Sequence, residues 1–211
     1  MTDVAILLYD RLTALDAIGP YEVLRGLPDS DLRFVAAEPG PKRTDHGSLA
    51  LVADHALTDV PSPDIIVVPG GPGEVQARAG NQVLDWLRAA DATSQWTTSV
   101  CTGSLILGAA GLLRGKRATS HWTALEELRK FGAEPTEERV VVQGKTVTAA
   151  GVSSGIDMAL WLVAQVAGDD VAKAIQLAIE YDPQPPFDAG STSKAPPEIV
   201  EMLRSSSRLA T

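Results

Sequence analysis

The sequence predicts a single α/β domain with a mostly parallel sheet covered by helices on both faces. Short, continuous apolar runs, such as VAILLY at 4–9 and IIVV within 63–74, are typical of strands buried on both faces. Segments with helical spacing of apolar residues separate these runs, and this alternation favours a parallel sheet. A length of 211 residues with 45% hydrophobic residues suits one domain that spans 1–211.

The first half of the chain divides at its glycines and prolines. A proline is tolerated in the first turn of a helix, so the helix that follows the first strand is expected to begin near Pro20. The expected elements are a strand at 4–9, a helix from Pro20 to Leu27, a strand at 31–38, a loop at 39–50, a short hairpin strand at 49–53, a strand within 63–74 and a helix from Asn81 to Ala92.

The second half repeats this alternation. The expected elements are a strand at 96–100, a helix from Thr102 to Leu113, a helix at 121–132 that ends at Gly132, two strands within 139–151 around a Gln143-Gly144 turn, and helices at 154–167 and 169–180. The tail at 182–211 is proline-rich, and we expect a short helix near 197–205 that packs on the domain.

Composition restricts the partners and the compartment. The formal net charge of −9 argues against a nucleic-acid backbone or an anionic membrane surface as a partner, and favours a neutral or cationic small molecule. A single cysteine cannot form an internal disulfide, and the apolar runs are too short to span a bilayer. Because the first ten residues also lack the features of a signal peptide, we expect a cytoplasmic protein.

The lone cysteine, Cys101, stands where a predicted strand ends and a helix begins. Ligand sites open at the carboxyl ends of parallel strands, and Gly103 permits the sharp turn of a nucleophile elbow. The helix N-terminus is expected to lower the pKa of the thiol. A free cysteine is more often a small buried hydrophobe, but this position favours a nucleophile.

A second candidate feature is the segment VVPGGPG at 67–73. Gly70 and Gly71 follow a strand, so their N–H groups are expected at the same sheet edge as Cys101, where they would stabilise a developing anion. On this segment alone the alternative is a plain tight turn. Both the G-x-G-x-x-G and the Walker A patterns are absent, which argues against a nucleotide loop.

Histidine does not supply an obvious base. The residue after Cys101 is Thr102, which excludes a dyad at the elbow, and His121 is the last histidine in the chain. A triad of the amidotransferase kind therefore cannot be assembled from the C-terminal half. His46, His55 and His121 lack metal-ligand spacing, so we expect no metal site.

A carboxyl group is the remaining acid–base candidate. Asp16 follows the first strand and is expected at the same sheet edge as Cys101, within reach for proton transfer. Asp16 can equally be a helix cap or a first-turn acid, and Glu22 competes for the catalytic role. Asp157 is expected to satisfy a helix end or a nearby loop.

Five blocks of sequence resemble the DJ-1/PfpI superfamily and, within it, the isonitrile hydratase group. They are LDAIGPYEVL, VVPGGPG, TSVCTGSLILGAAGLLRGKRATSHW, GVSSGIDMAL and EYDPQPPFDAGS. The blocks extend from about residue 4 to residue 191, so they cover nearly the whole chain. The resemblance implies a flavodoxin-like α/β sandwich, usually a homodimer, without a cofactor or a metal.

The resemblance also implies a reaction and its residues. In this group water adds to an isocyanide, R–N≡C, to give an N-substituted formamide. Cys101 would be the nucleophile and Asp16 the acid–base group, with Thr102 as a hydrogen-bonding neighbour and Gly71 as a backbone donor near the thiol. We hypothesise that the thiolate attacks the isocyanide carbon and Asp16 delivers the proton, so that a thioimidate forms. Water then attacks the thioimidate, and the thiol leaves.

The sequence departs from the group in one loop. Ala149-Ala150-Gly151 stands where members often have three glycines, and Val152 stands where isoleucine is frequent. This loop is expected to approach the elbow, so we count Val152 with Gly70 and Gly71 as substrate-binding residues and leave the natural substrate open. An aspartate at position 16, where glyoxalase-like members use glutamate, favours the hydratase group.

Other functions of the superfamily remain open alternatives. One is another cysteine-dependent activity, such as that of a glyoxalase or a deglycase-like hydrolase. A second is a ligand sensor like the N-terminal half of AraC-type regulators, although this chain has no room for two helix-turn-helix units and no basic stripe. A third is a redox sensor, because an elbow thiolate is readily oxidised.

Overall fold

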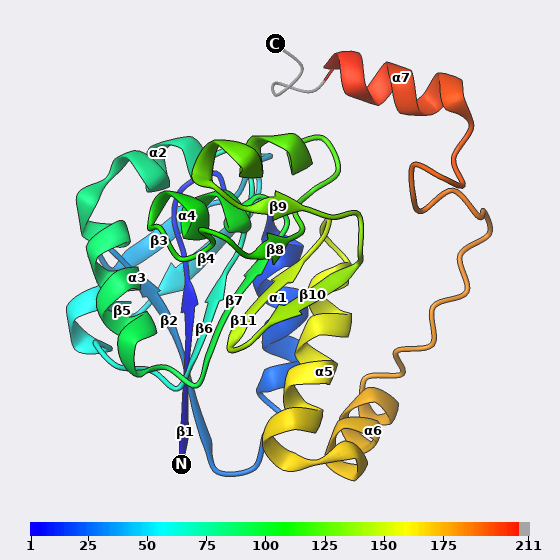
Figure 1. Ribbon diagram of the computed structural model, residues 1–211. Helices are drawn as coiled ribbons and strands as arrows, with labels where there is room; N and C mark the ends of the chain where they lie inside the picture. Colours follow the sequence, from blue (N-terminus) through cyan, green and yellow to red (C-terminus); the bar gives the residue numbers. More distant parts are fainter. Residues whose placement is uncertain (207–211) are drawn as a thin grey trace.

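Seven strands form the central sheet of the computed structural model, which describes residues 1–206 (Figure 1). In spatial order they are β10 (Val140–Gln143), β11 (Thr146–Ala149), β7 (Trp96–Val100), β6 (Ile65–Val68), β1 (Thr2–Leu7), β2 (Ser30–Ala36) and β5 (His55–Ala56). All neighbours are parallel except β10 and β11. The predicted α/β class is confirmed, and the order β2-β1-β6-β7-β11 is that of a flavodoxin-like sheet.

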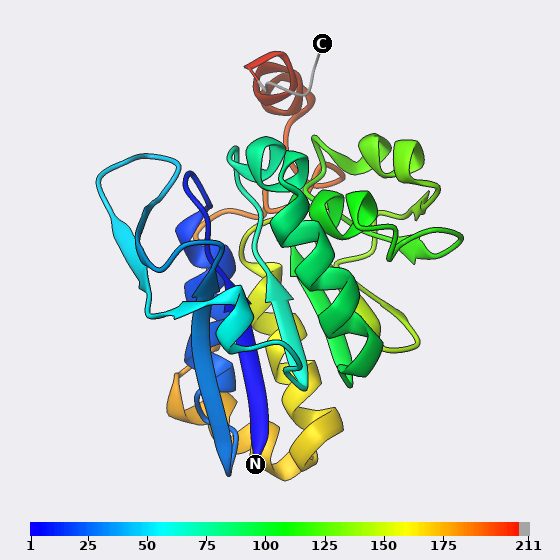
Figure 2. The same ribbon diagram turned by 90° about the vertical axis from the view of Figure 1, so that its left-hand side faces the viewer.

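Helices cover both faces of this sheet. Helices α1 (Ala14–Leu24) and α5 (Ser154–Ala167) pack together on one face, and α6 (Asp169–Ala178) packs against α5. Helices α2 (Glu74–Ala79), α3 (Asn81–Thr93) and α4 (Gly103–Ala109) lie on the opposite face, as Figures 1 and 2 show. In the described residues no helix is long and apolar enough to cross a membrane.

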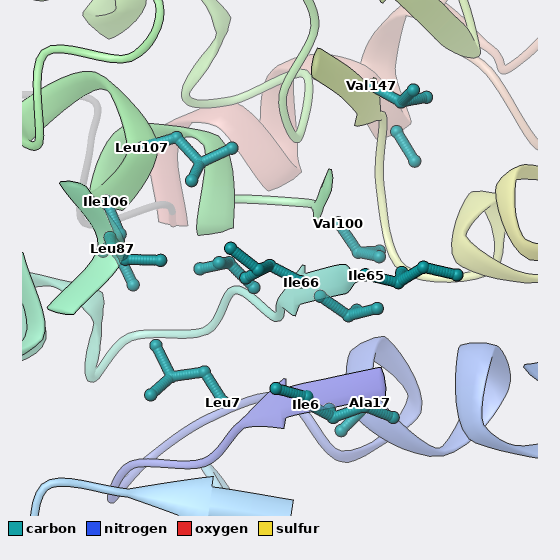
Figure 3. Close-up of a cluster of buried hydrophobic side chains, with 14 of the residues drawn as sticks. Ile6, Leu7, Ala17, Ile65, Ile66, Leu87, Val100, Ile106, Leu107 and Val147 are labelled. Carbon is teal, nitrogen blue, oxygen red and sulfur yellow. The ribbon is translucent and has the colours of Figure 1, made fainter. Parts of the chain in front are cut away.

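Aliphatic side chains fill the space between the sheet and its helices. In Figure 3, Ile6 of β1 lies on the side of Ala17 in α1, whereas Leu7 points to the opposite side, toward Leu87 and Leu107. All five side chains have no exposed surface. Because successive residues of a strand face opposite sides, both faces of β1 must be apolar, and burying each large side chain contributes about 1.5–3 kcal/mol.

The predicted start of α1 was wrong. The helix begins at Ala14 rather than near Pro20, which lies inside it. A proline there removes one helical hydrogen bond. Close packing on α5 compensates for this loss: a Cβ at Gly19 would lie 3.0 Å from Ile156, and a Cβ at Gly155 would lie 3.2 Å from Pro20.

Two later helices also differ from the prediction. Helix α4 ends at Ala109 rather than at Leu113, because the chain turns at Gly111 with a left-handed φ of 84°. The segment predicted as a helix at 121–132 forms a 3₁₀ helix, η2 (Leu125–Phe131), which ends at Gly132 as expected. The three-residue spacing of Leu125 and Leu128 places both side chains on one face of such a helix.

Short elements account for most of the segments that sequence patterns missed. Strand β3 (Gly40–Arg43), predicted as loop, pairs antiparallel with β4 (Ala50–Ala53), which was expected as a hairpin strand. The other short elements are η1 (Leu57–Asp59) and the parallel pair β8 (Arg117–Ala118) and β9 (Glu134–Pro135).

The tail leaves α6 and returns to the sheet edge where the parallel strands end (Figure 1). It finishes in α7 (Pro197–Ser206), which confirms the short helix expected near 197–205. None of the residues in α7 is buried. Its contact with the rest of the chain includes Arg204, whose guanidinium lies 5.8 Å from the centre of the Trp122 ring.

Gly103 is expected to be essential for the packing of α4 on β6. A Cβ at Gly103 would lie 2.0 Å from the carbonyl oxygen of Val68, so Gly103→Ala must push two backbone segments apart. We expect this substitution to lower the free energy of unfolding by about 2 kcal/mol or more, measured by urea denaturation.

Gly80→Ala is the matched control, because a Cβ at Gly80 makes only ordinary contacts, the nearest at 3.6 Å. This control should change stability by less than about 0.5 kcal/mol. Equal stability of the two variants would contradict the close approach of α4 to β6.

Candidate active site

Three turns of the chain meet at one edge of the sheet. They follow β1, β6 and β7, which are neighbouring parallel strands, so their carboxyl ends share that edge. The strand order changes direction at β1, because β2 lies on one side of it and β6 on the other. Such a switch point opens a crevice between the loops that follow the strands. The predicted residues Asp16, Gly70, Gly71 and Cys101 all lie there.

Cys101 occupies a strained turn between β7 and α4. Its φ of 58° lies in the left-handed region, which costs a residue with a side chain about 1–3 kcal/mol. Four hydrogen bonds hold the turn in place. The Cys101 N–H donates to the carbonyl oxygens of Ala149 and Ala150 at 3.0 and 2.9 Å, and the Cys101 carbonyl accepts from the hydroxyls of Ser104 and Ser120, each at 3.1 Å.

Asp16 lies behind the cysteine in the first turn of α1 and has no exposed surface. Its Oδ2 accepts a hydrogen bond from the Gly70 N–H at 2.9 Å. Its Oδ1 is buried and has no hydrogen bond of regular geometry with residues 1–206, although the Cys101 thiol lies beside the carboxyl group. Burial raises the pKa of Asp16 from 3.8 to about 7, against the opposing effects of the Gly70 N–H and the thiol.

The pKa of Cys101 differs in direction from the prediction. Burial and the neighbouring Asp16 carboxylate raise the pKa of the thiol well above its ordinary value. The backbone N–H groups of Thr102 and Val152 face the sulfur and act in the opposite direction, but they do not outweigh burial. The proton is therefore held on the thiol while Asp16 titrates near neutral pH.

Gly70, Gly71 and Thr102 connect the loop after β6 to the elbow. The Gly70 N–H is bound to Asp16, and the Gly71 N–H donates to the Thr102 hydroxyl at 2.9 Å. Both donors that we expected to face an anion are thus engaged within the protein. A Cβ at Gly70 would lie 2.4 Å from the Thr102 nitrogen, so glycine permits this close approach. The glycines position Asp16 and Thr102, and their contact with substrate stays a prediction.

A cavity of about 380 Å³ opens beside the thiol. Of the predicted residues, Gly71, Cys101, Thr102 and Val152 line it, whereas Asp16 lies beneath it. Sequence patterns did not assign the rest of the wall, which consists of Thr13, Pro72, Glu74, Val75, His121 and Ser206. Glu74 follows the predicted glycine loop directly, whereas Ser206 comes from the distant α7 and left no signal in the sequence.

His121 reaches this cavity although it cannot complete a triad. Its Nδ1 lies 2.8 Å from the Thr123 hydroxyl and accepts a hydrogen bond from the Thr123 N–H, so the neutral ring carries its proton on Nε2. Burial lowers the pKa of His121 and favours this neutral form. A Cβ at Gly151 would lie 2.9 Å from the ring, which explains a glycine at this position of the loop.

The other candidate groups lie elsewhere. Glu22, the competitor of Asp16, is exposed and pairs with Arg25 at 2.7 Å. Asp157 forms an ion pair with Arg139 and accepts a hydrogen bond from the Tyr181 hydroxyl, in agreement with a structural role. Within residues 1–206, no cluster of three or more histidine, cysteine or acidic side chains is arranged to hold a metal ion.

This arrangement can combine nucleophilic attack by the Cys101 sulfur with transfer of the thiol proton by Asp16. The thiol and the carboxyl group share a buried, mostly apolar environment, and the cavity gives a small molecule access to the sulfur. When Asp16 is ionised it can accept the thiol proton as the sulfur attacks, and it can then return that proton to the substrate. Together the two side chains supply a nucleophile, a base and an acid.

Known proteins are similar to this chain along most of its length. Residues 2–165 match the model of the DJ-1/PfpI family. The isonitrile hydratase of Pseudomonas putida is 43% identical over 201 residues, which cover 95% of this chain and 88% of the relative. The HTH-type transcriptional regulator CdhR of Pseudomonas aeruginosa is 31% identical over 140 residues, which cover 65% of this chain but only 41% of the regulator.

A solved structure is similar over nearly the whole fold. A ThiJ/PfpI family protein from Pseudomonas syringae superposes with a TM-score of 0.94 at 38% identity. The superposition covers 97% of this chain and 85% of the other. The similarity thus includes the described tail as well as the sheet and its helices.

Asp16→Asn should stabilise the folded protein at alkaline pH. The pKa of Asp16 is about 7 in the folded protein and 3.8 in an unfolded chain, so the stability that the neutral carboxyl group provides is lost as the pH rises from about 4 to about 7. Asparagine stays neutral and its amide oxygen can still accept from Gly70. The stability of the variant relative to the unmodified protein should increase by up to about 4 kcal/mol between these pH values.

Urea denaturation at pH values below and above this range measures the effect. Glu22→Gln, an exposed acid on the same helix, is the control and should show no gain that depends on pH. A variant less stable than the unmodified protein at alkaline pH would contradict the buried charge at Asp16.

Proposed function

This chain belongs to the DJ-1/PfpI family, and we propose that within the family it is an isonitrile hydratase, which converts R–N≡C and water into an N-substituted formamide. The observation that carries the proposal is the buried Cys101–Asp16 pair beside a cavity of about 380 Å³. Identity of 43% to an isonitrile hydratase along 95% of the chain supports the choice of substrate class.

The first half of the reaction forms a covalent intermediate. The Cys101 sulfur attacks the electrophilic carbon of the isocyanide as the thiol proton passes to Asp16. Asp16 then gives this proton to the same carbon, so a C–S bond and a C–H bond have formed. The product is a thioimidate, R–N=CH–S–Cys101, and the carboxyl group is again ionised.

The second half releases the formamide. Water adds to the thioimidate carbon while the Asp16 carboxylate removes one of its protons and passes it to the nitrogen, which gives R–NH–CH(OH)–S–Cys101. As the C–S bond breaks, Asp16 takes the hydroxyl proton and gives it to the leaving sulfur. One isocyanide and one water yield one R–NH–CHO, without oxidation or reduction, and the thiol–carboxylate pair is restored.

The surroundings of the pair fit these steps. The N–H groups of Thr102 and Val152 face the sulfur and favour its negative charge while the C–S bond forms and breaks. Pro72, Val75 and Val152 give the cavity apolar walls that suit an uncharged, linear isocyanide. The expected fall in the pKa of the thiol is unnecessary, because Asp16 accepts the proton during the attack.

We further propose that the protein acts in the cytoplasm as a homodimer, as the resemblance to its family implies. Light scattering during gel filtration measures the oligomeric state. A mass of about 44 kDa, twice the 22.2 kDa of the chain, would support the dimer, and a mass near 22.2 kDa would contradict it.

Cys101→Ala should abolish hydration of an alkyl isocyanide, with a loss of about a thousandfold or more in kcat/KM. Asp16→Asn should lower kcat by about a hundredfold or more, because the proton relay is lost. The assay follows formamide absorbance, and circular dichroism checks that the variants fold. If Cys101→Ala retains most of the turnover, the nucleophile is assigned wrongly. Turnover of methylglyoxal without any formamide from several isocyanides would favour a glyoxalase.

The pH profile tests the shared proton. The active pair holds one proton, whereas below the pKa of Asp16 both groups are protonated and no base remains. With a neutral isocyanide, kcat/KM should therefore rise as the pH passes through about 7 and then stay level. His121 does not cause this rise, because burial lowers its pKa. The rise should disappear in Asp16→Asn, and a profile that falls over the same range would contradict the assignment.

A further inference from the structure

One side chain of the cavity wall carries a polar hydrogen that the proposed reaction does not use. His121 lines the cavity that contains Cys101, whereas its sequence neighbours Ser120 and Trp122 line a second cavity of about 290 Å³. The His121 side chain is half-buried. The surroundings of its two ring nitrogens therefore decide whether His121 is only part of the wall or a binding group.

The two ring nitrogens of His121 differ in their contacts. Nδ1 accepts a hydrogen bond from the Thr123 N–H at 3.3 Å and lies 2.8 Å from the Thr123 hydroxyl. Nε2 has no hydrogen bond to any group in residues 1–206, yet it is not sealed in the interior as the Asp16 Oδ1 atom is. Burial lowers the pKa of His121 and favours the neutral ring. The ring thus presents an Nε2–H donor that a small molecule can reach.

Contacts on both sides of His121 place this donor near the reacting sulfur. The Ser120 hydroxyl donates to the Cys101 carbonyl at 3.1 Å, which holds the His121 segment against the elbow. A Cβ at Gly151 would lie 2.9 Å from Cδ2 and 3.6 Å from Nε2 of His121, so this edge of the ring lies against Gly151. The next residue of that loop is Val152, whose N–H faces the sulfur. The free donor therefore lies beside the loop that contacts the reacting atom.

The other side-chain hydroxyls of the cavity wall are already engaged. The Thr13 hydroxyl donates to a nearby carboxylate at 2.8 Å, and the Ser206 hydroxyl donates to a carbonyl of its own helix at 3.0 Å. The Thr102 hydroxyl is bonded to both the N–H and the carbonyl of Gly71. Apart from the thiol itself, His121 Nε2 is the side-chain donor of this wall that stays free for a ligand in the described part of the chain.

We propose that the His121 Nε2–H donates a hydrogen bond to the oxygen that water adds to the thioimidate carbon. The proposal rests on the proposed function and concerns its second half, because the isocyanide itself has no oxygen. The added oxygen lies two bonds from the Cys101 sulfur, and it gains negative charge when Asp16 removes the hydroxyl proton and the formamide carbonyl forms. A fixed donor in a mostly apolar cavity stabilises this charge. His121 keeps its own proton throughout, so the balance of the reaction is unchanged.

Rapid acid quench separates the two halves of the reaction and tests this role. His121→Phe retains an aromatic ring without a donor, so the adduct on Cys101 should form at its usual rate but decay about tenfold or more slowly. His121→Gln can donate from its amide and should recover part of the decay rate, which also covers the case that the phenylalanine variant fails to fold. Unchanged decay in His121→Phe would overturn the proposal. Equal slowing of formation and decay would also overturn it, because a merely structural role displaces the elbow.

His55→Phe is the matched control for these rates. His55 is also a half-buried histidine, but it lies in β5, the edge strand beyond β2, and does not line the cavity. This substitution should change neither the formation nor the decay of the adduct.

Binding to Cys101→Ala separates the role of His121 from the proposed function. N-hexylformamide carries the oxygen in question, whereas hexyl isocyanide has the same alkyl chain and no oxygen. In calorimetry, the additional substitution His121→Phe should weaken binding of the formamide about fivefold or more and leave binding of the isocyanide unchanged. If no isocyanide is hydrated but this selective loss is found, the proposed function is wrong and the donor role of His121 stands. If isocyanides are hydrated but neither adduct decay nor formamide affinity depends on His121, only the role of His121 is wrong.

Discussion

The left-handed backbone at Cys101 is the constraint on which the site depends. With a φ of 58°, this residue turns the chain directly from β7 into α4, so the thiol points into the crevice instead of into the sheet. The cost of this conformation is offset by four hydrogen bonds from two different loops and from α4. Gly103 lets the turn lie against the end of β6, and the loop after β6 is thereby placed to hold both Asp16 and Thr102.

Burial of the thiol–carboxylate pair controls how many protons the two groups hold. The environment that raises the pKa of both groups also opposes their ionisation together, so the pair retains one proton over a broad range of pH. Stability is lost when Asp16 ionises, yet the ionised form is the base that the proposed reaction requires.

Sequence patterns predicted the architecture and the centre of the site. Apolar runs identified the buried strands, and the position of Cys101 after one strand and Asp16 after another placed both at one sheet edge. The start of α1 was missed because packing against α5 outweighs the local effect of Pro20. The pKa of the thiol was misjudged because helix-end effects are visible in sequence whereas desolvation is not. Ser206 and His121 line the cavity because of tertiary contacts, which no local sequence pattern indicates.

A covalent bond between Cys101 and the intact isocyanide is the central claim. Rapid acid quench of the enzyme during turnover, followed by mass spectrometry of its peptides, measures this bond directly. The account predicts that the peptide containing Cys101 gains the full mass of the isocyanide, and that this species forms and decays at least as fast as product appears. Product formation with no such adduct on Cys101 at any quench time would contradict the account.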